Sequence, residues 1–144
     1  MLYIDTSVLL VYTLTQAVET ARVPATEAFF VKIATGSLVG ATSFYALHEV
    51  HVFAIANAPD FSTGAHFGKA ALEKILALPL LLLPLVSRTE RRHHARRFAA
   101  LRDATDVPHA IAAAVSGCEA IVAYDEHFRS IATTMPYKNP EDFL

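Results

Sequence analysis

Two aspartates stand directly after short apolar segments of the chain. Asp5 follows Leu2–Ile4, and Asp125 follows Ala120–Tyr124. Both apolar segments have the length and composition of buried strands. In an open parallel sheet, ligands bind at the carboxyl ends of the strands. We therefore expect both carboxylates at one edge of a sheet, where they could bind a cation.

Other acids add to this pair. Glu49 lies between Leu47 and Val50 in an apolar helical segment, which has little solvated face for a carboxylate. Asp106 stands at the start of a predicted helix, where an ordinary first-turn acid would also explain it. Asp103, three residues earlier, either supports the same site or pairs with a nearby arginine at the surface.

Carboxylates brought together repel one another, and their pKa values rise unless a cation neutralises them. Hard divalent cations prefer oxygen ligands, and Mg²⁺ also keeps water and phosphate oxygens in its coordination shell. Two such ions about 4 Å apart can activate a water molecule and stabilise a leaving oxygen. The sequence therefore predicts a Mg²⁺ or Mn²⁺ site that hydrolyses a phosphodiester. The expected metal ligands and catalytic residues are Asp5, Glu49, Asp106 and Asp125.

The elements that must position these acids alternate between strands and helices. Strands are predicted at 2–4, 38–41, 80–85 and 120–124, with a possible short edge strand in 136–144. Helices are predicted to begin near residue 8 and to span 25–34, 44–57, 62–77, 88–102 and 105–116. This order predicts an α/β fold, a three-layer α/β/α sandwich with a central, mainly parallel sheet of four or five strands. We expect a single domain over residues 1–144, with the run Leu80–Leu83 in its core.

Basic residues gather in the segment predicted as a helix over 88–102, although the net charge of the chain is −2. Six of the twelve basic residues fall within these fifteen positions, against one acid. Ala95, Phe98, Ala99 and Leu101 are expected to face inward. A solvated surface helix is the commoner meaning of such a pattern, but the excess of arginine favours a phosphate-binding surface. We assign substrate binding to Arg91, Arg92 and Arg96.

Composition excludes several other classes of protein. Hydrophobic residues make up 53% of the chain and charged residues 18%, which is not the composition of a disordered protein. The longest apolar run, Ile75–Val86, has twelve residues and two prolines, and a membrane helix needs about 20. The single cysteine, Cys118, excludes an internal disulfide, and Met1–Asp5 lacks the basic start of a signal peptide. A cytoplasmic location is expected.

Four segments together resemble the PIN-domain family, and within it the VapC-type toxins. They are similar, in the family's order, to its four acidic motifs: Tyr3–Leu10, Ser43–Val50, Asp106–Ala114 and Ile121–Phe128. The resemblance covers nearly the whole chain. Each motif alone is weak, whereas four in order are fairly specific.

The resemblance implies a ribonuclease that uses water to leave a 5′-phosphate and a 3′-hydroxyl, with Ser7 helping to position the metal, its water or the substrate. It also implies a homodimer and a cognate VapB-type antitoxin whose C-terminal segment blocks the site. Two positions depart from the family pattern. Ala123 stands where the family often has Thr or Ser, and Pro108 follows closely on Asp106.

Two other functions stay open. A PIN-like module that binds RNA or protein without cutting is favoured by Ala123. A metal-dependent phosphohydrolase of small phosphoesters is disfavoured, because Thr6 and Ser7 after Asp5 do not form an Asp-x-Asp-x-Thr motif. The histidines form no transition-metal signature. We interpret them as packing or surface residues; they include His48, His51, His109 and His127.

Overall fold

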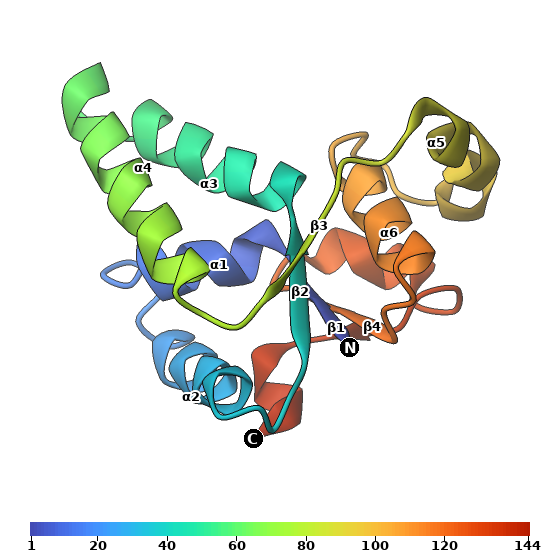
Figure 1. Ribbon diagram of the computed structural model, residues 1–144, viewed down its shortest axis with the longest axis horizontal. Helices are drawn as coiled ribbons and strands as arrows, with labels where there is room; N and C mark the ends of the chain where they lie inside the picture. Colours follow the sequence, from blue (N-terminus) through green and yellow to red (C-terminus); the bar gives the residue numbers. More distant parts are fainter.

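The sheet at the centre of the fold has five strands, and every neighbouring pair is parallel (Figure 1). The computed structural model describes residues 1–144. The strands lie in the order β3-β2-β1-β4-β5. Their bounds are β1 Leu2–Ile4, β2 Gly40–Ser43, β3 Leu81–Leu83, β4 Ala120–Val122 and β5 Tyr137–Lys138. The α/β prediction is confirmed, in its five-stranded form, and all strand pairs are parallel.

Helices cover both faces of this sheet. The α-helices are α1 Thr6–Thr13, α2 Val23–Ala34, α3 Phe44–Ala56, α4 Phe61–Leu76, α5 Arg88–His94 and α6 Asp106–Val115. Short 3-10 helices span Ala95–Phe98, Glu126–Ile131 and Pro140–Phe143. Helices α1 to α4 build one hydrophobic cluster against the sheet, and α6 with the first two 3-10 helices builds the other. The predicted three-layer sandwich is confirmed.

Alternation along β1 joins the two layers to the sheet. Leu2 and Ile4 belong to the cluster of α1 to α4, whereas Tyr3 belongs to the cluster of α6. The backbone N–H of Asp5 donates to the carbonyl of Val122 over 3.0 Å, so pairing with β4 continues past the end of β1. Asp5 therefore emerges at the carboxyl edge of the sheet.

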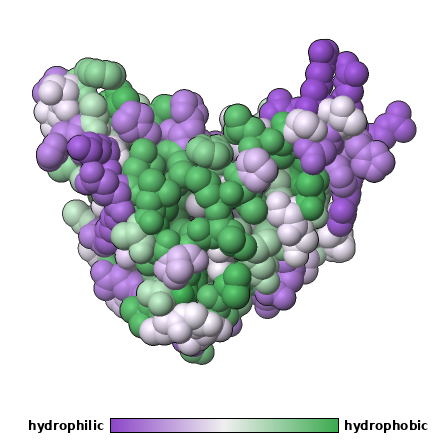
Figure 2. Space-filling view, viewed as in Figure 1, coloured by the Kyte–Doolittle hydropathy of each residue, from purple (hydrophilic) through white to green (hydrophobic).

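The leucine run around β3 was predicted to be core, and this is wrong for two of its members. Leu81 and Leu82 are 53% and 39% exposed, and only Leu83 is buried. The reason is that β3 is an edge strand, so one side of it has no neighbouring strand. Figure 2 shows apolar residues at the surface over the middle of this view.

The basic segment does not form one helix. Helix α5 ends at His94, a 3-10 helix follows over Ala95–Phe98, and the chain then turns. Phe98 and Leu101 are buried as predicted, but Ala95 and Ala99 are exposed. A 3-10 helix has 3.0 residues per turn, so it rotates side chains away from the face that a continuous α-helix would present.

Other predicted bounds differ by a few residues. The second strand begins at Gly40 and not at Leu38, and α1 begins at Thr6 and not at Val8. The predicted fourth strand stops at Val122, two residues earlier than expected. No helix in the structure combines the length and the hydropathy that a membrane crossing requires.

Candidate metal-binding active site

Asp5 caps α1 and joins the ends of two strands. Its Oδ2 accepts hydrogen bonds from the Ser7 backbone N–H at 2.9 Å and from the Ser7 hydroxyl at 2.6 Å. The Ser7 Oγ in turn accepts from the Tyr124 N–H at 2.9 Å, which ties the start of α1 to the chain after β4. Asp5 is only 5% exposed, and its second oxygen, Oδ1, lies 3.7 Å from His109 Nδ1. The carboxylate is therefore buried and held in one orientation.

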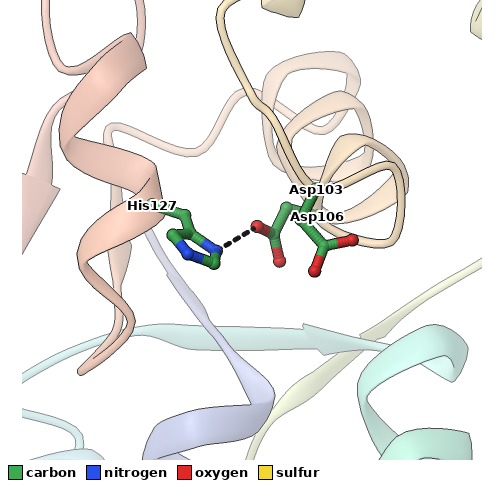
Figure 3. Close-up of side chains that lie close together, drawn as sticks. All are labelled: Asp103, Asp106 and His127. Carbon is green, nitrogen blue, oxygen red and sulfur yellow. Dashed lines mark hydrogen bonds and ion pairs between the residues drawn. The ribbon is translucent and has the colours of Figure 1, made fainter.

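Asp125 and Asp106 share one histidine. Asp125 Oδ1 accepts from the His127 N–H at 2.9 Å, which caps the 3-10 helix that follows β4. The His127 Nδ1 lies 3.3 Å from Asp106 Oδ2 and 3.3 Å from Asp125 Oδ1. Figure 3 shows the imidazole directed at Asp106, with Asp103 beside it. One ligand atom from each of Asp103, Asp106 and His127 lies within 4.8 Å of the others.

Glu49 reaches the site from α3. Ser43 caps this helix, as predicted, by accepting from the Ala46 N–H at 3.4 Å. Both carboxylate oxygens of Glu49 have side-chain partners. Oε1 lies 3.2 Å from His109 Nε2, and Oε2 accepts from the Thr6 hydroxyl. Glu49 is half-buried, so its carboxylate faces the same open space as Asp5.

All four predicted acids line one cavity of about 250 Å³. Ser7 lines it too, and so does Asp103, whose place the sequence left open. The nine lining residues include one apolar side chain: Asp5, Thr6, Ser7, Leu10, Glu49, Asp103, Thr105, Asp106 and Asp125. The strand order reverses between β1 and β4, and this is the point at which open α/β sheets bind ligands. The acids share a cavity, and their roles as metal ligands stay predictions.

The electrostatics of the cavity favour a bound cation. Burial raises the pKa of Asp106 to about 6, and the charges of Asp125, Asp103 and Asp5 add to this rise. Burial also raises the pKa of Asp5, against the opposing effects of His109 and Ser7. A divalent cation with oxygen ligands would relieve this crowding of carboxylates, so the donor set fits Mg²⁺ or Mn²⁺.

Glu49 differs from the other acids. Burial acts to raise its pKa, but the hydrogen bonds from His109 and Thr6 outweigh burial, and the pKa is lowered. For His109, burial acts to lower the pKa, whereas the contacts with Glu49 and Asp5 raise it overall. Glu49 is therefore the acid that the surrounding side chains hold most firmly in its ionised form.

The arginines assigned to substrate binding do not enter this cavity. Arg91, Arg92 and Arg96 are exposed on α5 and the 3-10 helix after it, and their side chains make no hydrogen bond or ion pair. In Figure 2 a hydrophilic arm that carries α5 stands across a notch from the arm of α3 and α4. Arg102 lies nearer the acids, in a cavity of about 260 Å³ that His127 also lines.

The position that departs from the family pattern lies outside the cavity. Ala123 is fully buried in the cluster of α6, and its N–H donates to the carbonyl of Lys138 at 3.0 Å. It does not line the acidic cavity. Pro108 stands in the first turn of α6, where proline is tolerated, and Asp106 opens that helix as predicted.

Three residues of the site were missed from the sequence. His109 and His127 contact the acids, although we interpreted them as packing or surface residues, and Thr6 was given no role in the site. A signal was present for each. His109 stands three residues after Asp106 on the same helix, which puts both on one face. Thr6 and His127 lie within two residues of Asp5 and Asp125.

No protein-family model and no curated protein matches this sequence. Two solved structures do match the fold. The first is VapC20 of Mycobacterium tuberculosis, a sarcin-ricin loop cleaving toxin, with 18% identity, a TM-score of 0.65 and coverage of 94% of this chain and 96% of that one. The second is VapBC2 of Rickettsia felis, bound to a DNA fragment from its promoter, with 14% identity, a TM-score of 0.67 and coverage of 96% and 98%.

The chain has the VapC-type PIN fold. This confirms the resemblance on which the fold was expected. In this VapC-type PIN fold, the acids of the first and last motifs follow β1 and β4, which are neighbours in the sheet. The acids of the other two motifs come from α3 and α6 and lie across the same cavity.

Proposed function

We propose that this chain is a Mg²⁺- or Mn²⁺-dependent endoribonuclease, the toxin of a toxin–antitoxin pair. The observation that supports this most is that four carboxylates from four elements line one cavity in a VapC-type fold. The raised pKa of Asp106, about 6, also supports a cation as the missing charge. The description of VapC20 as a sarcin-ricin loop cleaving toxin supports RNA as the substrate class.

In this proposal, Asp5, Glu49, Asp106 and Asp125 hold the metal. When bound, the ion lowers the pKa of a water molecule and stabilises charge on the phosphate oxygens. The protein's own contribution is orientation. Ser7 donates to Asp5 and accepts from Tyr124, so its hydroxyl supports the placement of that carboxylate beside any contact it makes with substrate. Water adds to phosphorus, the 3′-oxygen leaves and takes up a proton, and the products are a 5′-phosphate and a 3′-hydroxyl.

The proposal includes the partners of the chain. We infer a cognate VapB-type antitoxin, a homodimer, a cytoplasmic location and a single domain over residues 1–144. The pairing of the two components in the VapBC2 structure supports the antitoxin. The exposed leucines of β3 are available for protein contacts.

The proposal is tested by cleavage of a panel of single-stranded and structured RNAs by the purified, antitoxin-free protein. Cleavage is expected with Mg²⁺ or Mn²⁺ and not with EDTA. A generic phosphomonoester serves as the control substrate and is expected to stay intact. Metal binding without cleavage of any RNA would reject the nuclease and favour the binding module. Hydrolysis of the phosphomonoester alone would favour a small-molecule phosphohydrolase.

A second experiment concerns the arginine arm. Replacement of Arg91, Arg92 and Arg96 by alanine is expected to weaken RNA binding, because each lost phosphate contact lowers the slope of log affinity against log salt by about 0.7. The measurement is RNA affinity at several salt concentrations, with the catalytic acids intact. Lys69→Ala, which removes an exposed cation from α4, is the control and should leave the slope unchanged. An unchanged slope in the triple variant would remove these arginines from the binding surface.

A further inference from the structure

A chain of buried polar side chains runs beneath the acidic cavity. Ser43, Tyr3 and His109 are 0%, 0% and 1% exposed. The Tyr3 Oη lies 2.6 Å from Ser43 Oγ and 2.8 Å from His109 Nδ1. The other ring nitrogen of His109, Nε2, lies 3.2 Å from Glu49 Oε1. The end of β2, the middle of β1, α6 and α3 each contribute one member.

The hydrogens of this chain can be assigned from its start. Ser43 Oγ accepts from the Ala46 N–H, so its own hydroxyl hydrogen is free to point at Tyr3. Burial raises the pKa of Tyr3 well above its ordinary value, so the phenol stays protonated and donates to His109 Nδ1. A neutral imidazole whose Nδ1 accepts carries its hydrogen on Nε2. That hydrogen faces Glu49, and every member of the chain donates to the next.

Packing alone does not require these polar groups. Tyr3 lies in the apolar cluster of α6, where a phenylalanine ring would fill the same space. Polar groups buried in such surroundings must be hydrogen-bonded or they destabilise the fold. Histidine tautomers fixed by a second hydrogen bond are a common way to orient the groups around a metal. The arrangement ends on Glu49, whose other oxygen is held by Thr6.

We propose that His109 is a positioning residue, which holds the Glu49 carboxylate toward the cavity in the Nε2–H tautomer that Tyr3 selects. Tyr3 and Ser43 act through His109, and none of the three contacts the substrate. This inference rests on the proposed function in that Glu49 is taken as a metal ligand. Removal of His109 leaves Glu49 free to turn into solvent, which lowers metal affinity without removing any ligand.

Three variants test the proposal: His109→Leu, His109→Gln and Tyr3→Phe. The measurements are Mg²⁺ and Mn²⁺ affinity by titration calorimetry, RNA cleavage, and the imidazole nitrogen signals of the Mg²⁺-loaded protein by NMR. His109→Leu is expected to lose about 10- to 100-fold in metal affinity, as other residues that orient metal ligands do. His109→Gln keeps an amide donor near Nε2 and should stay within a few-fold of wild type. Tyr3→Phe keeps the ring, and a population of the Nδ1–H tautomer should appear.

Two results would overturn the proposal. One is a folded His109→Leu protein with wild-type metal affinity, or a His109→Gln protein as weak as the leucine variant. The other is an imidazolium or an Nδ1–H tautomer in the Mg²⁺-loaded wild type, and this measurement decides the matter even where His109→Leu fails to fold. Absence of RNA cleavage by the wild type would reject the proposed function alone, because the affinity and the tautomer are read without RNA.

Discussion

Asp5→Asn is expected to remove RNA cleavage by at least about 100-fold and to leave the fold intact. Residues that only orient metal ligands cost about 10- to 100-fold when they are lost, and loss of a ligand's charge reaches or exceeds that range. Asparagine has nearly the same shape and caps helices as well as aspartate does. Its amide oxygen can still accept from the Ser7 N–H, which lies 2.9 Å from Asp5 Oδ2. Only the charge and one acceptor oxygen are lost.

The stability of the Asp5→Asn protein separates loss of chemistry from loss of fold. Burial raises the pKa of Asp5, so the folded state without metal disfavours its ionised form. At neutral pH in EDTA, the variant should therefore melt at the wild-type temperature or above it. The measurements are the cleavage rate with Mn²⁺ and the melting temperature with EDTA.

Asp60→Asn is the matched control for Asp5→Asn. Asp60 also caps a helix, α4, where its Oδ1 accepts from the Thr63 N–H at 2.8 Å, but it is exposed and does not line the acidic cavity. This variant should cleave RNA like the wild type. Full activity of Asp5→Asn would show that Asp5 is not a metal ligand.

The metal-free protein is expected to lose stability through Asp106 as the pH rises from about 4 to about 6. The pKa of this carboxyl rises from 3.8 to about 6 on folding, chiefly through burial. Between these two values the folded state keeps a proton that the unfolded chain has released. The free energy of unfolding therefore falls as the pH rises, by about 1–3 kcal/mol. Saturating Mg²⁺ should offset this loss, because the ion binds the ionised form in the folded state.

The contribution of Asp106 is measured as a difference between proteins. Urea unfolding of wild type and Asp106→Asn is followed across this pH range in EDTA, and asparagine cannot titrate. The wild type should fall relative to the variant as the pH rises. Asp60→Asn provides a control of opposite sign, because the hydrogen bonds from Thr63 lower the pKa of Asp60, and its contribution is lost as the pH falls. Parallel curves for wild type and Asp106→Asn would contradict the raised pKa.

The parts of the structure that the sequence determined by itself depend on short stretches of chain. Ser43 begins α3 as predicted, because its hydroxyl reaches a backbone N–H three residues on. Gly36 and Gly117, predicted to stop helices, adopt φ angles of 76° and 70°, which other residues rarely reach. Asp5 and Asp125 follow strands that are adjacent and parallel, so both acids emerge at one edge of the sheet.

Other features were decided only by tertiary structure, because they depend on which elements become neighbours. Nothing in the chain near Leu81 and Leu82 indicates that β3 lies at an edge of the sheet, so their exposure could not be predicted from apolar character. The contact between His109 and Glu49 joins residues sixty positions apart. It exists because α6 and α3 lie on opposite sides of the carboxyl edge of the sheet. The sequence named the acids, and the crossing of the helices over the sheet supplied the side chains that hold them.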